Sequence, residues 1–442
     1  MTKAASRRRG KVVASPSSRD GDNSSDSILK ILIASHSHPQ LSKGGAEISA
    51  FELFKELQGQ PQCEPWFLGC DRRETDQKLG ARISQPFSDR EYIYSVGAYD
   101  WFKFANRDAG FPQDFRHLLK RLQPRVVHFH HYLGFGVEAF LHVRETLPEC
   151  KIVLTLHEYL ALCHHFGQMI TNPDRSLCYE SKPERCAECF ENIAVSDFFL
   201  RRLYIERFFA LVDLFIAPSE FLAERYVAWG VPKARMTVIE NVIPAPLNQP
   251  AAAALDQPDL LRVGFFGQIS FLKGINVLLE AAEILLNRKV DGIVFEIYGD
   301  YRGQPPEFKT DFLARLAKAG RNVKFHGPYD QGRVDGLMQS VDLVLMPSIW
   351  WENSPVVIEE ALRNRRPVLC SDIGGMAEKI RDGVDGLHFP VGNSAALSYL
   401  LLKLAKAPAR LKNLRSTLRS PSLTRDVVAR HRTLYAELLL GA

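Results

Sequence analysis

The sequence predicts an α/β protein with two doubly wound, Rossmann-like domains, each a parallel sheet with helices on both faces. Two observations favour this fold class. From residue 28 onward, short apolar strands alternate with amphipathic helices, and the alternation runs in two separate series. A proline-rich stretch, residues 244–260, lies between the two series and reads as a linker. Two such series joined by a linker are typical of two domains that face each other across a cleft.

The first 27 residues are predicted to form a disordered basic tail. They hold six Lys or Arg and three Asp residues, a net charge of +3, and no apolar segment of signal-peptide length. Contact of this tail with acidic lipid or nucleic acid is a minority alternative.

The remaining composition excludes several classes of protein. The whole chain carries +5, so the part after the tail carries only +2, too little to indicate a nucleic-acid-binding surface. There is no apolar run of about 18 residues that could span a membrane. Eight cysteines in 442 residues do not form the pattern of a disulfide framework. We therefore expect a cytoplasmic protein that binds no nucleic acid.

The first series spans residues 28–243. Its first strand, Ile28 to Ser35, is largely apolar, as expected of a buried parallel strand. The loop Ser42 to Gly45 follows, and then a helix with an apolar face. Further strands are predicted at Val126 to Phe129, Lys151 to Leu156, Leu214 to Ala217 and Met236 to Glu240. A cysteine-rich insertion occupies residues 163–189.

The second series spans residues 261–415. Its strands are predicted at Arg262 to Phe266, Val294 to Tyr298, Val323 to His326, Leu343 to Pro347 and Pro367 to Cys370. The last segment, residues 416–442, contains a helix with apolar residues at helical spacing, among them Val427, Val428 and Tyr435. It lies beyond the last strand of the second domain, and we expect it to cross back to the first.

The strongest chemical signal is the segment Trp351 to Ala361. Ser354 and Pro355 suit the N-cap and first residue of a helix, whose open amides favour a phosphate group. Glu352 lies just before that helix and Glu360 about one and a half turns into it. Two carboxylates on either side of an anion site suit a ligand with hydroxyl groups on both sides of a diphosphate. The alternative is a capped helix with two solvent-facing acids.

Similar loops follow other predicted strands. Gly267 to Gly274 contains Lys273, which would point a charge at the start of the next helix. Ser371 to Gly375 follows another strand, and Gly44 and Gly45 would let the backbone of the first domain approach a ligand. These loops all lie at carboxyl ends of parallel strands, where doubly wound folds bind ligands.

These residues resemble the retaining glycosyltransferases of family 4, which have the two-domain GT-B fold. The resemblance covers nearly the whole chain from residue 28. Its most specific part is Glu352, seven further residues and Glu360, followed by Ala361. Supporting matches are Gly44 to Glu47, Leu156 to Glu158, Ala217 to Glu220, Ile239 to Val242, Lys273 with Gly274, Pro367 with Val368, and Ile373 to Gly386.

The resemblance implies a role for each matched residue. Glu360 would hold the ribose of the donor and Lys273 its diphosphate, which Gly44 and Gly45 would let approach. The donor sugar would lie against Glu352 and the backbone of Asn353 and Ser354, and His157 would line the reaction centre. Two departures from the family pattern stand out. Gln268 replaces a frequent Arg at the diphosphate, and Asn241-Val242 replaces the usual Asn-Gly turn.

The resemblance also implies the reaction. A nucleotide-diphosphate sugar would bind to the second domain and a glycan, lipid-linked or other hydroxyl acceptor to the first. The transfer would retain anomeric configuration and need no metal cofactor, and the only Asp-x-Asp, Asp20 to Asp22, lies in the tail. Two alternatives are a non-catalytic nucleotide-binding partner protein of this fold and a sugar-nucleotide epimerase. The base, sugar and acceptor are not identified.

Four cysteines in the insertion form a second constellation: Cys163, Cys178, Cys186 and Cys189, the last two as Cys-x-x-Cys. Their spacing fits a structural zinc site, and the alternative is a set of unconnected thiols.

Three further motifs have ordinary explanations. His128, His130 and His131 end a strand and fit polar residues at a cleft better than metal ligands. Gly134-x-Gly136-x-x-Ala139 imitates a dinucleotide fingerprint but lacks the acid that should follow. A segment from Phe198 to Phe209 mixes aromatic residues with arginines. It could rest on the inner face of a membrane. More commonly, the aromatic residues of such a helix lie in the core and its charged residues face solvent.

Overall fold

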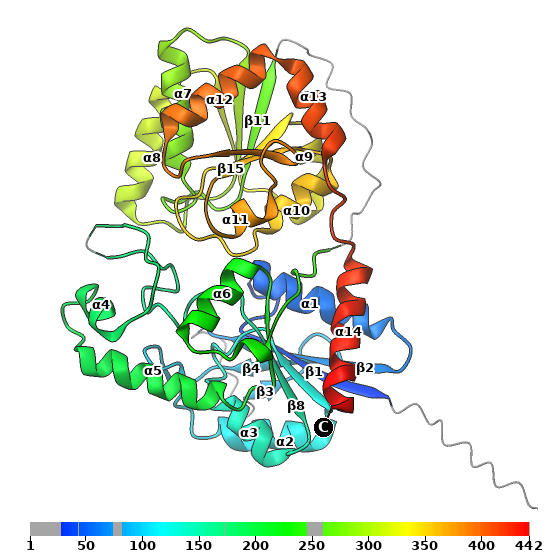
Figure 1. Cartoon of the computed structure of the whole chain (residues 1–442). Helices are drawn as coiled ribbons and strands as arrows, with labels where there is room; N and C mark the ends of the chain where they lie inside the picture. Colours follow the sequence, from blue (N-terminus) through cyan, green and yellow to red (C-terminus); the bar gives the residue numbers. More distant parts are fainter. Residues whose placement is uncertain (1–27, 43, 74–81, 173, 245–259, 442) are drawn as a thin grey trace, which may run out of the picture.

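The structure is a computed structural model that describes residues 28–42, 44–73, 82–172, 174–244 and 260–441. The predicted tail and nearly all of the predicted linker lie outside the described residues. Two domains are stacked end to end, with the second domain above the first in Figure 1. Each is an α/β unit built around one large sheet.

The first domain contains an eight-stranded sheet in the order β10-β9-β8-β7-β1-β2-β4-β3. All its strand pairs are parallel except β3 with β4. The strands are β1 (Leu29–Ser35), β2 (Cys63–Asp71), β3 (Ile83–Ser84), β4 (Glu91–Ser95), β7 (Val126–Phe129), β8 (Lys151–Thr155), β9 (Leu214–Ala217) and β10 (Met236–Val238); a separate hairpin pairs β5 (Tyr99–Asp100) with β6 (Ala105–Asn106). The helices are α1 (Gly45–Gln58), α2 (Phe111–Leu122), α3 (Ala139–Thr146), α4 (Pro183–Glu188), α5 (Val195–Phe209) and α6 (Glu220–Trp229).

The second domain contains a six-stranded, wholly parallel sheet in the order β13-β12-β11-β14-β15-β16. Its strands are β11 (Leu261–Phe266), β12 (Ile293–Tyr298), β13 (Val323–Gly327), β14 (Leu343–Met346), β15 (Val368–Ser371) and β16 (Gly386–Phe389). Its helices are α7 (Ile275–Asn287), α8 (Pro306–Lys318), α9 (Val334–Gln339), α10 (Val356–Arg363), α11 (Gly374–Lys379), α12 (Ser394–Lys406) and α13 (Pro408–Thr417).

The central strands are buried because helices cover both faces of each sheet. The last five residues of β1 are buried, and so are all residues of β7 and of β14. This explains why these strands read as continuous apolar runs rather than as alternating patterns. The predicted two-domain, doubly wound architecture is confirmed.

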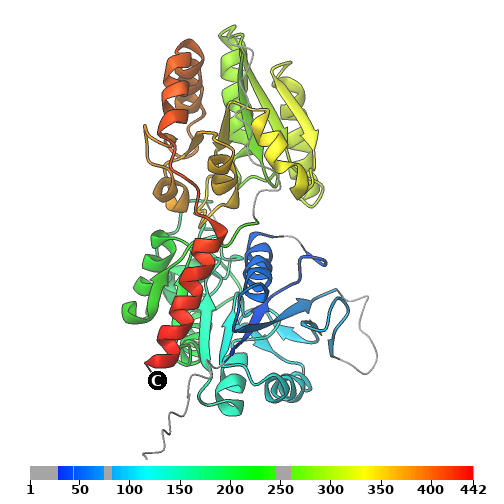
Figure 2. The ribbon, with the colours of Figure 1, turned by 90° about the vertical axis from the view of Figure 1, so that its right-hand side faces the viewer.

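The last helix, α14 (Thr424–Leu440), leaves the second domain and packs on the first. Figures 1 and 2 both show it running down the side of the first domain. Its Val427, Val428 and Tyr435 join a buried cluster with Ile31 and Phe54 of β1 and α1. In the part of the chain that the structure describes, no helix combines the length and apolar character that a membrane span needs.

Candidate functional site

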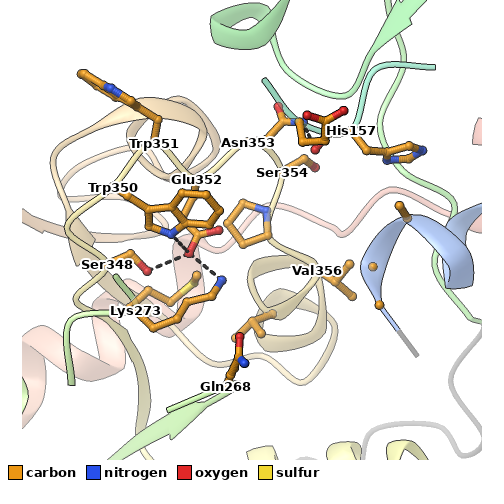
Figure 3. A pocket seen from close by; sticks show the side chains of 18 of the residues that line it. His157, Gln268, Lys273, Ser348, Trp350, Trp351, Glu352, Asn353, Ser354 and Val356 are labelled. Atoms are coloured by element: carbon orange, nitrogen blue, oxygen red, sulfur yellow. Dashed lines mark hydrogen bonds and ion pairs between the residues drawn. The ribbon is translucent and has the colours of Figure 1, made fainter. Parts of the chain in front are cut away.

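A cavity of about 460 Å³ lies between the two domains. Its walls come from loops that follow strands of both sheets and from the first turns of α1 and α10. Eight of the nine residues assigned to catalysis or donor binding line it: Gly44, Gly45, His157, Gln268, Lys273, Glu352, Asn353 and Ser354. Glu360 is the exception. Figure 3 shows the second-domain residues Gln268, Lys273, Trp350 and Glu352 on one side, with His157 on the other.

Glu352 is the most densely bonded side chain of the cavity. It is 5% exposed, and its Oε1 accepts hydrogen bonds from Lys273 Nζ at 2.6 Å, Ser348 Oγ at 2.8 Å and Trp350 Nε1 at 2.9 Å. All three donors point at this one oxygen in Figure 3. Oε2 makes no hydrogen bond within the residues that the structure describes. One carboxylate oxygen is therefore fixed, while the other is available to a ligand.

Lys273 is placed by a backbone that only glycine permits. Its neighbour Gly274 has φ +71°, and a Cβ there would lie 1.8 Å from the carbonyl oxygen of Pro347. The loop before α7 is thereby packed directly on the loop that carries Glu352. This close approach explains why Lys-Gly stands at this position.

Two helix starts point their amides at the cavity from opposite domains. Gly45 begins α1 and Val356 begins α10, and both line the cavity. The N-cap of α10 is Pro355, one residue later than the predicted Ser354, and Pro355 offers no side-chain cap. The two helix starts thus supply open amides on both sides of the cavity, an arrangement that favours a phosphate group.

Glu360 does not line the cavity, although it lies on α10. It is 4% exposed, and Gln331 Nε2 donates to its Oε1 at 2.5 Å. Burial raises the pKa of this carboxyl above its ordinary value, while the bond from Gln331 opposes that shift. A ligand that bonds Glu360 would replace or join Gln331.

The wall of the first domain is built from the loop after β8. His157 lines the cavity, and its carbonyl oxygen accepts a hydrogen bond from Asn353 Nδ2 at 3.0 Å. Burial lowers the pKa of His157 to about 3, so the ring is neutral near pH 7. The neighbouring Glu158 also lines the cavity, 3.2 Å from His131 Nε2, and burial raises its pKa to about 8.

The two departures from the family pattern are accommodated locally. Gln268 lies in the cavity with Lys273, so the second-domain wall carries one cation there. Val242 donates its backbone N–H to Ser49 Oγ at 3.0 Å, and its φ is not positive. A glycine is therefore not needed at residue 242, and Asn241 still reaches the cavity.

Asn353 connects the domains beside Glu352. Its Oδ1 accepts from Ser219 Oγ at 2.8 Å while its Nδ2 reaches His157. A second connection is Glu378, whose carboxylate accepts from the first two amides of α6 at 2.8 Å each. Gly375 lies so close to Asn353 that a Cβ would meet its carbonyl oxygen at 1.6 Å. The glycine pair of residues 374–375 thus serves loop packing at the domain boundary.

The predicted zinc site is not supported by the arrangement of the cysteines. In the ranges that the structure describes, no group of three or more His, Cys, Asp or Glu side chains could hold a metal ion. Cys178 Sγ donates to the carbonyl oxygen of Glu180 at 3.2 Å, and Cys186 Sγ lies 3.8 Å from Ser181 Oγ. Burial raises the pKa of the Cys163 thiol to about 11, and the neighbouring Cys178 and Cys186 raise it further. Zinc binding by these four cysteines stays a prediction.

The insertion instead contacts the loops of the second domain. The carbonyl oxygen of Cys178 accepts a hydrogen bond from Trp351 Nε1 at 3.0 Å, and the Arg175 guanidinium lies 4.9 Å from the ring centre of Phe271. Trp351 also stacks on Phe221 of α6. These contacts hold the insertion against the loops that carry Phe271 and Glu352.

The remaining motifs lie within the first domain. His128, His130 and His131 are buried, and Gly134 and Gly136 have positive φ in a tight turn. Arg201 is buried and donates to the carbonyl oxygens of Phe102, Leu160 and Ala161. The exposed apolar side chains of α5 are Val195, Phe199, Leu200 and Leu203. Membrane contact through this helix stays a prediction.

Sequence reasoning missed several residues of the site. Ser348 and Trp350 bind the fixed oxygen of Glu352, and Glu158 lines the opposite wall. Ser348 could have been found, because it directly follows a strand at the edge where ligands bind. The bond from Trp350 depends on the fold of the loop and leaves no signal in the sequence.

Two family models match consecutive parts of the chain. The model described as Glycosyltransferase Family 4 matches residues 43–245, and the model described as Glycosyl transferases group 1 matches residues 253–420. These ranges correspond to the two domains. Among curated proteins, the amylovoran biosynthesis glycosyltransferase of Erwinia amylovora is 29% identical over 213 residues, 46% of this chain and 50% of that protein. The chain thus spans about half the length of this relative.

Solved structures share the fold over nearly the whole chain. Anabaena HepE in complex with UDP and glucose superposes with a TM-score of 0.64 at 16% identity, over 92% of this chain and 99% of that chain. Sucrose-phosphate synthase from Thermosynechococcus elongatus gives a TM-score of 0.69 at 16% identity, over 93% and 100%. At these identities the likeness shows the arrangement of the two domains.

Proposed function

Because the chain belongs to the family-4 type of glycosyltransferases with the GT-B fold, we propose that it transfers a sugar from a nucleotide-diphosphate sugar to a hydroxyl acceptor. The transfer retains the anomeric configuration and needs no metal ion. The observation that carries this proposal is the cavity between the domains. There an ion pair of Lys273 with Glu352 lies beside the open amides of α10.

The second domain suits the donor. Its diphosphate would lie against Lys273 and the first turn of α10, where a cation and a helix start offset its charge. Glu360, deeper in the same helix, would accept the ribose hydroxyls in place of Gln331. The free Oε2 of Glu352 would face the sugar, which gains positive character as the diphosphate leaves.

The first domain suits the acceptor, because His157 and Glu158 line the opposite wall. The acceptor hydroxyl would attack the anomeric carbon on the face that the diphosphate leaves, and its proton would pass to that diphosphate. One bond forms to the acceptor oxygen while the bond to phosphate breaks, so configuration is retained. Lys273 and the helix starts stabilise the leaving group, a task that a metal ion performs in other enzymes.

The relatives favour a role in glycan assembly. They include an amylovoran biosynthesis glycosyltransferase and a lipopolysaccharide 1,2-N-acetylglucosaminetransferase. For this chain we propose a glycan or lipid-linked acceptor and a cytoplasmic reaction, in which α5 would contact the inner face of a membrane.

Thermal shift with a set of nucleotide sugars tests the proposal. A ligand at a hundred times its Kd should add about 2.7 kcal/mol to the free energy of unfolding. The sugar that binds is then incubated with and without candidate acceptors, and release of nucleoside diphosphate is measured. Acceptor-dependent release supports the proposal. Conversion of the nucleotide sugar into its epimer without acceptor and without net release of nucleoside diphosphate would indicate an epimerase, and binding without any turnover would indicate a non-catalytic partner protein.

A further inference from the structure

A row of histidine side chains leads from the cavity into the first domain. His157 follows β8 at the cavity wall, and His130 lies behind it, directly after β7. The two rings are stacked, with centres 5.3 Å apart and an angle of 24° between their planes. Nδ1 of His130 lies 3.1 Å from Nε2 of His157. Because His130 is only 2% exposed, this contact is made inside the protein.

Both rings are neutral near pH 7. Burial lowers the pKa of His157 to about 3 and the pKa of His130 well below its ordinary value. Neighbouring histidines lower both pKa values further. A neutral imidazole carries one N–H donor and one acceptor nitrogen. In the bond between the two rings, therefore, one donates and the other accepts.

The surroundings of His130 indicate which ring donates. Its second nitrogen, Nε2, is buried and has no hydrogen-bond partner within the described part of the chain. If Nε2 carried the proton, that N–H would be a buried donor without an acceptor, an arrangement that is rarer in proteins than an unpaired acceptor. The proton of His130 is therefore best placed on Nδ1, where it points at His157.

The ring of His130 is held in this orientation from behind. His128 lies 4.3 Å away between ring centres and is bonded at both nitrogens. Its Nε2 lies 2.7 Å from Thr155 Oγ1, and its Nδ1 lies 2.6 Å from the hydroxyl of Tyr435 on α14. His128 cannot turn without breaking two buried hydrogen bonds, so it forms a fixed surface against which His130 packs.

We propose that His130 is a positioning residue for the sugar transfer, because its Nδ1–H donates to Nε2 of His157 and fixes the tautomer of that ring. His157 then carries its own proton on Nδ1, which makes no hydrogen bond within the described residues. It offers the ligand one N–H donor, suited to a hydroxyl oxygen of the sugar, and has no free lone pair to act as a base. The catalytic consequence rests on the proposed function, whereas the tautomer does not.

Nitrogen NMR of the full chain labelled with ¹⁵N-histidine tests the tautomer directly. The ring signals of His157 are identified by their loss in His157→Gln, with His117→Gln of the exposed face of α2 as the control. We expect a protonated Nδ1 and a bare Nε2 in the wild-type protein. A protonated Nε2 on His157 would overturn the proposal. This measurement needs no turnover and no folded variant of His130, so it stands even if the proposed function fails.

Two variants of His130 test its effect on the reaction. His130→Leu removes the donor and leaves a buried acceptor on His157 unpaired, and we expect kcat to fall about 5- to 150-fold. Nucleoside-diphosphate affinity should stay unchanged, since the nucleoside diphosphate lacks the sugar that His157 would face. His130→Asn returns an N–H near the place of Nδ1 and should restore most of kcat together with the Nδ1-protonated His157. Equal loss of kcat in both variants, with the tautomer of His157 unaltered, would contradict a positioning role.

Discussion

Glu352 and Glu360 lie eight residues apart, but the structure gives them different surroundings. Oε1 of Glu352 accepts three hydrogen bonds in the cavity, one of them from the cation Lys273. Glu360 is buried behind the cavity lining with one bond from Gln331. The first carboxylate is therefore suited to the reacting sugar and the second to a part of the donor that does not react.

Changing each of the two acids to the isosteric amide should impair a different property of the protein. Glu360→Gln removes a charged acceptor for ribose, which costs about 1.5–3 kcal/mol and weakens nucleoside-diphosphate binding roughly 10- to 150-fold. Glu352→Gln should lower kcat mainly, and diphosphate binding should not weaken, because Lys273 loses its anionic partner and becomes more available. Calorimetry and steady-state kinetics on both variants measure these effects. If Glu352→Gln weakens diphosphate binding as much as Glu360→Gln, this division of roles is wrong.

For single residues, the sequence predicted which side chains belong to the site better than it predicted the side chains they would bond. Glu352 and Lys273 were predicted as site residues because each lies in a loop that follows a strand at the ligand-binding edge, and His157 because of the resemblance to family 4. The ion pair between Glu352 and Lys273 could not be predicted, since the two are 79 residues apart and meet only because Gly274 allows their loops to touch. The contact of His130 with His157 likewise depends on the neighbouring positions of β7 and β8 in the sheet.

Among the elements, α14 has the clearest effect on the site. It is the last helix of the chain, yet its Tyr435 hydroxyl bonds His128, which packs on His130 behind the cavity. The helical spacing of apolar residues predicted α14, and its packing on the first domain is what the structure shows. The bond to His128 joins residues 307 positions apart and has no local signal.

Tyr435→Phe should test how much this connection contributes to stability. The change leaves Nδ1 of His128 without its buried partner, and we expect the free energy of unfolding to fall by about 1–3 kcal/mol. Tyr132→Phe is the matched control, because the Tyr132 hydroxyl is buried and unpaired within the described residues. Its removal should cost little or nothing. Chemical denaturation of the full chain measures both, and an equal loss in the two variants would contradict the account of α14.

The elements that sequence reasoning missed are those with weak local patterns. β2 contains a proline and a glycine, and β16 is only four residues long, so neither stands out as an apolar run. In the insertion, cysteine spacing predicted zinc, which stays a prediction, and Cys178 and Cys186 make local hydrogen bonds. The contact of the insertion with Trp351 was not predicted, because it depends on how the two domains meet.

At the scale of the whole molecule, the residues that join the domains adjoin those that face the donor. Asn353 follows Glu352 directly and reaches both Ser219 and the His157 carbonyl of the first domain. Glu378 and Lys379 of α11 add bonds to α6 and to Glu240. In the proposed function, a donor bound at Glu352 would therefore lie next to Asn353, which joins the two domains.

The configuration of the product tests the central claim, a transfer in which the acceptor attacks on the face that the diphosphate leaves. The nucleotide sugar with the largest thermal shift is incubated with the protein and an acceptor, and the anomeric proton signals are followed by NMR from the first turnovers. We predict that the first product formed has the same anomeric configuration as the donor. A first product of inverted configuration would contradict the account, whatever the donor and acceptor prove to be.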